Sequence, residues 1–249
     1  MKNPAAPARP VFSYRGKTKD VAAFASRGRR FLLLRFKDNL LGRAGRPDSG
    51  GNEVVGTRAG KGAASAAMCE YFFKKFEAGG IPTHFRGRPS RTDVVVEKTR
   101  RIGVEFICRN RAWGSYLSRG AKRRVRALEA FGRPVVEYTL KSDMLDDPLL
   151  DSKQILSHAT SRELAAIRSA MLKMNRVARA PCRRAGIELV DFKAEFGRRF
   201  GGKSSSRAPS RLLLIDDFSC DTARFFKGRR LLCHFEVCKA LGIPLAKSG

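Results

Sequence analysis

The segment from Asp191 to Glu195 reads DFKAE and alternates charged with apolar residues. Because successive side chains of a β-strand point to opposite faces, Asp191, Lys193 and Glu195 would lie together on one face. In an arbitrary sequence such a polar face is most often simply solvated. The next strand-like run of the chain argues against that interpretation here.

That run, LLLI at 212–215, is apolar enough for a buried strand and stops at Asp216 and Asp217. It would bring carboxylates to the edge of an apolar sheet, where their oxygens could hold a hard cation. If the two strands pair, Glu195 and Asp216 can converge on that cation. The connecting loop is too long to define the register, and two aspartates are also an ordinary end to a strand, so the convergence is a hypothesis.

Two basic turns could bind phosphate groups. From Arg109 to Ser115 the chain reads RNRAWGS, which joins guanidinium groups to a small-residue turn and a hydroxyl suited to a phosphate monoester. The segment YRGKTK at 14–19 matches neither common glycine-rich phosphate motif, but Lys17 and Lys19 in a glycine-containing hairpin could cover a triphosphate. Taken alone, the first segment is more readily interpreted as a basic turn in a basic protein. The second could be only a solvated hairpin, and spacing does not choose between its alternatives.

Cysteine and histidine offer no further chemistry. The six cysteines include no CxxC pair and no Cys/His set with zinc-ligand spacing, so we expect reduced packing residues. The three histidines, His84, His158 and His234, stand apart from any HExxH or Ser/His/Asp order. We expect structural or surface roles for them.

A mixture of strand-like and helical periods must position these groups. Strands are predicted over 11–14, 20–25, 30–36, 93–97, 103–109, 135–140, 187–196 and 212–218. Helices are predicted over 63–77, 161–185 and 231–241, with partial helix in the basic segment 119–133. The glycine-rich segment 42–62 is expected to be a long mobile loop.

Composition places the chain among globular proteins, with 43% hydrophobic and 30% charged residues. No apolar run reaches the roughly 18 residues of a membrane-spanning helix, and the first residues lack the apolar core of a secretory signal. We therefore expect a soluble, cytoplasmic protein with no membrane partner. The formal net charge of +28 is of a size common among nucleic-acid-binding proteins.

Eight segments resemble, in order from about Tyr14 to Phe225, the phosphoribosylaminoimidazole-succinocarboxamide synthase (SAICAR synthetase) family. The strings are YRGKTK at 14–19, RFKD at 35–38, GKG at 60–62, AGGIPTHF at 78–85, EFICRNRAWGS at 105–115, KSDMLDDPL at 141–149, AGIELVDFKAEFG at 185–197 and DDFSCDTARF at 216–225. Any one string could arise by chance, but eight in sequence are specific.

The resemblance implies an ATP-dependent ligase of purine synthesis. Members of the family use Mg²⁺ and ATP to activate the carboxylate of the aminoimidazole nucleotide CAIR, and the amine of L-aspartate then displaces phosphate to give SAICAR. The implied fold is α+β, with a small antiparallel N-terminal lobe, a larger mixed lobe and nucleotides between them. We expect a loose tail over 1–10, an ATP-covering lobe over 11–88, a substrate- and metal-binding lobe over 89–249, and a homo-oligomer.

Matching positions transfer the family's functional residues to this chain. The resemblance assigns Asp191, Lys193 and Asp221 to a catalytic set near the CAIR ring and carboxylate, Lys17, Lys19, Lys141 and Asp143 to ATP, Arg109, Ser115 and Arg224 to the CAIR phosphate, and Glu195 and Asp216 to Mg²⁺. Lysines and metal-holding carboxylates are the groups that phosphoryl transfer requires.

The chain also departs from the family. The string Ser-Cys-Asp at 219–221 replaces Ser-Pro-Asp, Ser65 and Ala66 replace paired asparagines, and a tryptophan and an Asp-Lys-Asp segment expected after Phe225 are missing. These changes bear on efficiency more than on the type of reaction.

The rival interpretation is a basic nucleic-acid-binding protein with the same fold. Basic clusters at 121–126, 198–203 and 227–230 favour it. The clusters lack interleaved aromatic residues for base stacking. A solvated basic surface is therefore the preferred interpretation.

Overall fold

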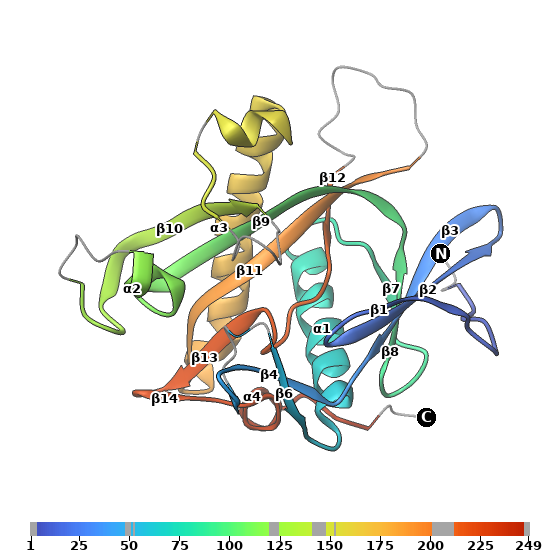
Figure 1. Cartoon of the computed structure of the whole chain (residues 1–249), viewed down its shortest axis with the longest axis horizontal. Helices are drawn as coiled ribbons and strands as arrows, with labels where there is room; N and C mark the ends of the chain where they lie inside the picture. Colours follow the sequence, from blue (N-terminus) through green and yellow to red (C-terminus); the bar gives the residue numbers. More distant parts are fainter. Residues whose placement is uncertain are drawn as a thin grey trace.

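The computed structural model describes residues 4–47, 51, 53–119, 125–140, 148–151, 153–200 and 212–246. Within these ranges the chain forms two larger antiparallel sheets, a small three-stranded sheet and four α-helices (Figure 1). The α+β class expected from the resemblance is confirmed.

The first sheet is built from strands in the first hundred residues. Its order is β1 (Phe12–Arg15), β2 (Lys19–Ser26), β3 (Arg29–Phe36), β8 (Asp93–Glu97) and β7 (Phe85–Gly87). The strands predicted over 11–14, 20–25, 30–36 and 93–97 are confirmed. Because β8 pairs with β3, this sheet extends past residue 88, where the lobe boundary was expected. The division into lobes stays a prediction, and this pairing would move the boundary beyond Glu97.

The second sheet carries most of the candidate chemistry. Its order is β10 (Ala130–Leu140), β9 (Thr99–Arg111), β11 (Glu188–Arg199), β13 (Ala223–Lys227) and β14 (Arg230–Leu231), and β12 (Leu212–Ile215) also pairs with β11. All of these pairings are antiparallel. One edge of β11 therefore meets β9, and the other edge meets β13 and β12 in turn. The pairing on which the convergence of Glu195 and Asp216 depended is confirmed.

The long loop expected over 42–62 was wrong. β4 (Asn39–Arg43), β5 (Arg46–Pro47) and β6 (Glu53–Thr57) form a small antiparallel sheet there. A Cβ on Gly42 would lie 2.1 Å from the backbone oxygen of Arg46, which is too close for any side chain. Glycine in a strand can mark such a close backbone approach. Gly42 therefore permits this small sheet, whereas the sequence analysis interpreted the glycines of this segment as evidence for a loop.

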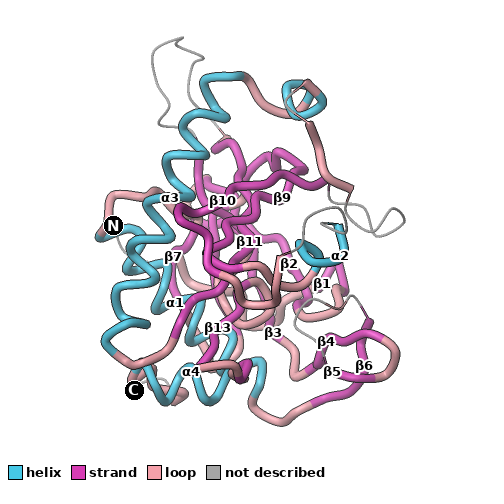
Figure 2. Tube along the Cα trace, turned by 90° about the vertical axis from the view of Figure 1, so that its left-hand side faces the viewer, coloured by secondary structure: helices cyan, strands magenta, loops and turns pink. Residues whose placement is uncertain are grey.

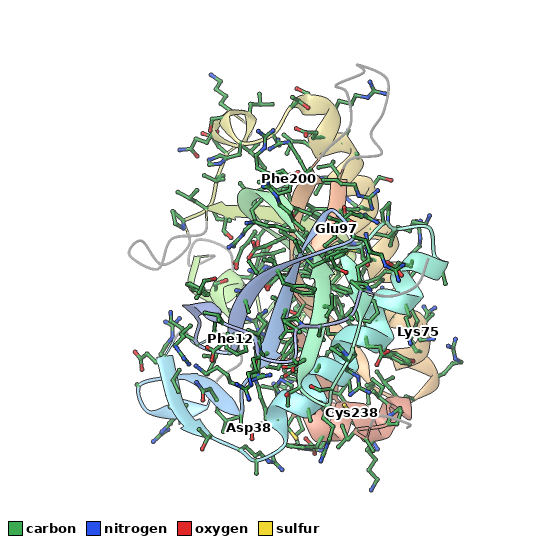
Figure 3. The ribbon with its side chains drawn as sticks, turned by 90° about the vertical axis from the view of Figure 1, so that its right-hand side faces the viewer. Phe12, Asp38, Lys75, Glu97, Phe200 and Cys238 are labelled. Carbon is green, nitrogen blue, oxygen red and sulfur yellow. The ribbon has the colours of Figure 1, made fainter. Side chains whose placement is uncertain are left out.

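The helix α1 (Lys61–Ala78) begins at a cap supplied from outside the helix. The carboxylate of Asp38 accepts hydrogen bonds from the backbone N–H groups of Gly60 at 3.1 Å and Gly62 at 2.8 Å. Asp38 is labelled near the start of α1 in Figure 3. These groups have no partner within a helix, and a carboxylate there also opposes the helix dipole. The predicted helix over 63–77 is confirmed.

The helix α3 (Ser161–Arg184) begins with a capping box. The hydroxyl of Thr160 accepts from the backbone N–H of Glu163, and the Glu163 carboxylate accepts from the backbone N–H of Thr160. Figure 2 shows α3 along the outer side of β9, β10 and β11. The shorter helices are α2 (Ser115–Arg119), α4 (His234–Leu241) and a 3₁₀ turn at Gln154–Ser157. None of the described helices has the length and apolarity needed to cross a membrane.

One strand ends earlier than predicted. The prediction over 212–218 extended β12 to Phe218, but the strand stops at Ile215. The next residue, Asp216, has a φ of 69°, a left-handed conformation that cannot continue an extended strand. The strand pattern therefore ends where the candidate metal ligand begins.

Two helix predictions also need correction, one near the C-terminus and one in the basic segment 119–133. The helix predicted over 231–241 begins only at His234, because Leu231 belongs to β14. In the basic segment 119–133, positions 120–124 lie outside the described residues, and β10 begins at Ala130.

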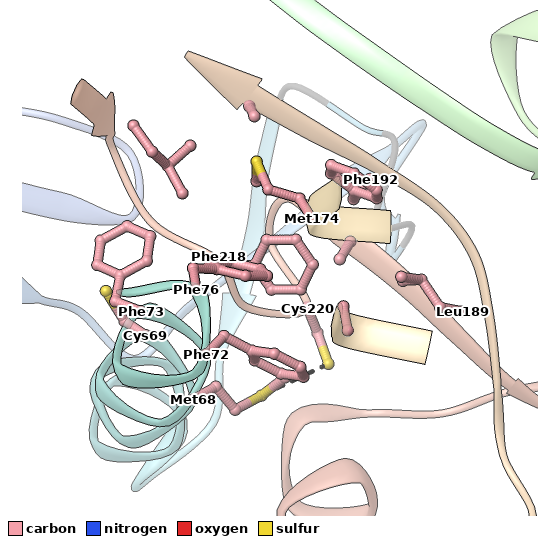
Figure 4. Packing of buried hydrophobic residues seen from close by; sticks show 14 of the residues in the cluster. Met68, Cys69, Phe72, Phe73, Phe76, Met174, Leu189, Phe192, Phe218 and Cys220 are labelled. Atoms are coloured by element: carbon pink, nitrogen blue, oxygen red, sulfur yellow. Dashed lines mark hydrogen bonds between the residues drawn. The ribbon is translucent and has the colours of Figure 1, made fainter. Parts of the chain in front are cut away.

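Phenylalanines pack α1 against the second sheet (Figure 4). The ring of Phe72 lies 4.7 Å from that of Phe218 and 5.9 Å from that of Phe225. Phe218 in turn lies 5.3 Å from Phe192 on β11. All four rings are buried. The apolar face of β11 is therefore held by the core, and its charged face points the other way.

We expect Glu163 to link fold stability to pH. Hydrogen bonds from Arg198 hold the pKa of Glu163 at about 2, below its ordinary value of 4.5. Because the folded-state pKa is the lower one, this stabilisation is complete above pH 4.5 and is lost as the pH falls towards 2. The free energy of unfolding lost by Glu163→Gln, measured with urea, should shrink across that window. The exposed Glu53→Gln is the control, and a pH-independent difference for Glu163→Gln would contradict the expectation.

Candidate active site

The charged face of β11 is buried, although its residues alternate as expected. Asp191 is 2% exposed and Glu195 is 4% exposed, while Lys193 between them is partly exposed. The strand register sets Asp191 opposite Arg109 on β9 and opposite Arg224 on β13. Because a buried carboxylate is stable only with a charged or hydrogen-bonding partner, the neighbouring strands must supply cations.

Asp191 joins the two arginines expected at the substrate phosphate. Its Oδ2 accepts from Arg109 Nη1 at 3.0 Å and from Arg224 Nη1 at 2.7 Å. Arg109 Nη2 donates to the Ser115 hydroxyl at 3.0 Å. At Gly114, where φ is +56°, a Cβ would lie 3.3 Å from the Arg224 guanidinium. The structure thus brings together all three residues predicted for phosphate binding.

Arg109 is the structural centre of this group. Its side chain is 1% exposed, and its Nε donates to Glu137 at 2.5 Å while Nη1 also donates to the Trp113 carbonyl at 3.2 Å. With Asp191 and Ser115, these acceptors use most of the guanidinium donors. Arg224 retains 12% side-chain exposure and is the arginine better placed to meet a ligand.

The other end of β11 meets the end of β12. Glu195 is the register partner of Ile215, so Asp216 follows directly on the paired strand. Each carboxylate contacts a cation: Arg101 Nη2 lies 2.7 Å from Glu195, and Lys19 Nζ lies 2.6 Å from Asp216. Both predicted metal ligands and one predicted ATP contact therefore lie around the end of β12.

Lys19 of β2 also pairs with Asp217, which was not among the predicted residues. Burial would lower the pKa of Lys19, but the charges of Asp216 and Asp217 raise it well above its ordinary value. Burial raises the pKa of Asp217 against the opposing charge of Lys19. Asp217 is further held by the hydroxyl of Ser219 at 2.7 Å. The signal for Asp217 was the paired aspartate at the strand end.

A second residue that was not predicted, the cation Lys61, lies at the first position of α1. Its side chain is 1% exposed, and its Nζ lies 2.5 Å from Asp221 Oδ2. His234 Nε2 lies 3.5 Å from the other oxygen of Asp221, and the Ser65 hydroxyl lies 3.4 Å from Oδ2. Burial would raise the pKa of Asp221, but His234 and Lys61 lower it below its ordinary value. Asp221 is thereby kept ionised. The sequence feature that could have indicated Lys61 is the GKG string at 60–62.

Two more contacts complete the charged face. Lys193 Nζ lies 3.2 Å from the carboxylate of Glu105 on β9. His84 Nε2 lies 3.0 Å from the backbone oxygen of Asp216. Burial lowers the pKa of His84 to about 3, so the neutral ring donates this hydrogen bond. The structural role expected for His84 is consistent with this contact.

The other ATP candidates are less well placed by the structure. Lys17 is exposed in the turn before β2, where its carbonyl accepts from Asn39 Nδ2 at 2.7 Å. Lys141 and Asp143 lie outside the described residues. Their assignments stay predictions.

Comparisons of the sequence and of the structure with known proteins point to the same family. A model described as SAICAR synthetase matches residues 12–231. The phosphoribosylaminoimidazole-succinocarboxamide synthase of Streptococcus sanguinis is 32% identical over 86% of this chain and 83% of its own length. The crystal structure of that synthase from Ehrlichia chaffeensis matches with a TM-score of 0.82 and 27% identity, covering 94% of this chain and 99% of the other. A SAICAR synthetase solved in complex with ADP matches with a TM-score of 0.76 and 28% identity, covering 92% and 93%.

We expect Lys61→Met to destabilise the protein by about 3–5 kcal/mol, because it leaves the buried Asp221 charge without its ammonium partner. Urea unfolding at pH 7 measures the change. The double variant Lys61→Met with Asp221→Asn should recover much of the loss, since no charge is then left unpaired. Lys74→Met, an exposed position of the same helix, is the control. A loss for Lys61→Met no larger than that of Lys74→Met would contradict the expectation.

Proposed function

The chain belongs to the SAICAR synthetase family, and from that premise we propose that it uses ATP to join the carboxylate of CAIR to the amine of L-aspartate. The products are SAICAR, ADP and phosphate, in purine biosynthesis. The observation that carries the proposal is the arrangement of β11, with the phosphate-binding candidates at Asp191 and the metal-binding candidates at Glu195. A strand rises about 3.3 Å per residue, so these acids are about 13 Å apart along it, enough for a phosphoribosyl nucleotide to lie between them.

The reaction takes place in two displacements. A CAIR carboxylate oxygen attacks the γ-phosphorus of ATP, and the bond to ADP breaks as the new O–P bond forms. The aspartate amine then attacks the acyl carbon, phosphate leaves, and the nitrogen loses a proton. Phosphorylation is needed because a carboxylate is a poor electrophile, whereas an acyl phosphate has a good leaving group. A cytoplasmic location, expected from the composition, and a homo-oligomeric state, implied by the resemblance, belong to the same proposal.

At the phosphate end, we assign Arg224 and Ser115 to the CAIR phosphate, with Arg109 holding them in place. Arg224 has donors beyond the one given to Asp191, and guanidinium groups suit the planar recognition of phosphate oxygens. Protein acceptors use most of the donors of Arg109, so its contribution is to orient Ser115 and Asp191.

Between the two ends, Lys193 and Asp221 suit the reacting groups of CAIR. Lys193 projects from the middle of the charged face of β11 and can neutralise a carboxylate. Asp221, kept ionised by Lys61 and His234, can accept a hydrogen bond from an amino group on the ring.

At the other end, Lys19, Lys17, Lys141 and Asp143 are the proposed ATP contacts. Lys19 Nζ lies against Asp216, so bound phosphates would compete with that carboxylate for the ammonium. The exchange replaces one ion pair by another, so the lysine stays neutralised throughout.

The carboxylates of Glu195 and Asp216 fit Mg²⁺. Both are hard oxygen donors, and each is held by a cation: Arg101 contacts the buried Glu195, and Lys19 contacts the partly exposed Asp216. Two carboxylates suffice, because Mg²⁺ is usually bound by one or two carboxylates together with substrate phosphates and water. When bound, Mg²⁺ would neutralise charge on the phosphates being transferred.

We expect Arg224→Ala to raise KM for CAIR by about 10- to 100-fold while changing KM for ATP by less than about threefold. The variant removes charge-assisted hydrogen bonds to one substrate only, each worth about 1.5–3 kcal/mol. Initial rates with each substrate varied in turn measure the two constants. The exposed Arg229→Ala should change neither, and an equal rise in both constants for Arg224→Ala would remove this arginine from the CAIR phosphate site.

The parent protein should release ADP over many turnovers only when CAIR and L-aspartate are both present, and Glu195→Gln or Asp216→Asn should lower turnover by about 10²–10³-fold. Each amide keeps the shape of the side chain but loses the charge that holds Mg²⁺. The rates are measured across a Mg²⁺ titration, with circular dichroism as the folding control and Asp151→Asn as the matched variant. Partial rescue by high Mg²⁺ would support the role. Turnover within about tenfold of the parent at ordinary Mg²⁺ would exclude that carboxylate as a principal ligand.

A further inference from the structure

α3 has two faces of opposite character. At about 100° per residue, its buried positions fall within one arc of about 120°. These positions are apolar or neutral: Ile167, Met171, Met174, Asn175, Ala178, Pro181 and Cys182. The opposite arc, about 160° wide, carries seven cations: Arg162, Arg168, Lys173, Arg176, Arg179, Arg183 and Arg184. Glu163 is the only acid of the helix.

Six of these seven cations, from Arg168 to Arg184, have no acidic partner among the described residues. Glu163 is engaged by Arg198, whose Nε lies 2.7 Å from it. In the part of the chain that the structure describes, no carboxylate pairs with any of the six basic side chains from Arg168 to Arg184. Around the candidate active site, by contrast, each buried acid holds a lysine or arginine. Within the described ranges, the positive charge of these six side chains is therefore not balanced by an acid.

The outer face is separate from the candidate active site. α3 packs on the side of β11 that carries Phe192 and Phe196, which share a core with Met171 and Met174. Asp191, Lys193 and Glu195 lie on the other side of the strand. Figure 2 shows α3 at the outside of the molecule, with the second sheet on one side of it only. A partner could therefore bind α3 without entering the site.

We propose that the outer face of α3 binds the phosphate backbone of duplex nucleic acid without preference for base sequence. Six of its seven cations are arginines, whose guanidinium groups recognise phosphate oxygens through two hydrogen bonds at once. At about 1.5 Å per residue, Arg168 and Arg184 are about 24 Å apart along the helix. A duplex presents a charge every 1.7 Å or so of its axis, so several phosphates can lie along this face.

Two other polyanions fit the face less well. A helix that binds a membrane surface inserts its apolar side, but the apolar side of α3 is buried against the second sheet and α1. Single-stranded nucleic acid is usually held by bases stacked on aromatic rings, and α3 contains no aromatic residue. A phosphate backbone with its bases turned inward is the chemistry that remains.

Fluorescence anisotropy with a labelled, mixed-sequence 20-base-pair DNA duplex, read between 50 and 200 mM salt, tests the proposal. The variant Arg168→Gln, Arg176→Gln, Arg183→Gln should weaken binding at least tenfold at 100 mM salt. It should also lower the slope of log affinity against log salt by about 2–3, at roughly 0.9 for each phosphate that the variant no longer neutralises. The control is Arg46→Gln, Arg91→Gln, Arg229→Gln, which removes the same charge from exposed positions on other elements. It should change the affinity less than threefold.

Three results would overturn the proposal. Equal losses in the two triple variants would mean that the duplex responds only to net charge. Absence of salt-sensitive duplex binding by the parent would remove the partner. Binding of vesicles containing 30% phosphatidylserine, weakened by the α3 variant, without duplex binding would assign the face to a membrane. Circular dichroism confirms folding of both variants, and the test does not depend on ligase activity, so the two functions can fail separately.

Discussion

Two buried carboxylates on one central strand, β11, determine which charged residues the neighbouring strands must supply. β11 is paired along both edges, so Asp191 and Glu195 cannot be solvated by moving to a sheet edge. An unpaired carboxylate in that position would cost several kcal/mol. The flanking strands supply arginines that pair with both acids: Arg109 and Arg224 contact Asp191, and Arg101 contacts Glu195. The cations that stabilise this strand are also those that a phosphorylated, carboxylated ligand would need.

The turn between β12 and β13 is held in a similar way from the first part of the chain. Lys19 comes from the first sheet and contacts Asp216, and Lys61 comes from the start of α1 and contacts Asp221. Both contacts join residues that are far apart in sequence, so this part of the site exists only when the two sheets and α1 are packed together. Phe72 packs α1 against Phe218 and Phe225, and Phe73 packs it against Phe85 of the first sheet. Core stability and site geometry are therefore coupled.

The cations that give the chain its net charge of +28 have different surroundings in the two parts of the structure. Near the charged face of β11 the cations are matched by acids, and they add little net field there. On α3 the same residue types face solvent with Glu163 as the sole acid of the helix, and that acid is already engaged. The ligase family accounts for the first group and not for the second. A field from one helical face can steer a polyanion without any change in the active site.

The sequence by itself determined what depends on neighbouring residues. The strand over 187–196 and its alternation of Asp191, Lys193 and Glu195 were predictable, because the period of a strand is written in consecutive side chains. The matching strings identified the family because they too are runs of consecutive residues. Only the tertiary structure decided that this face is buried, that Asp216 turns out of its strand, and that Lys61 meets Asp221. Strand register and helix packing bring these groups together across long stretches of chain, and no local pattern reports such a contact.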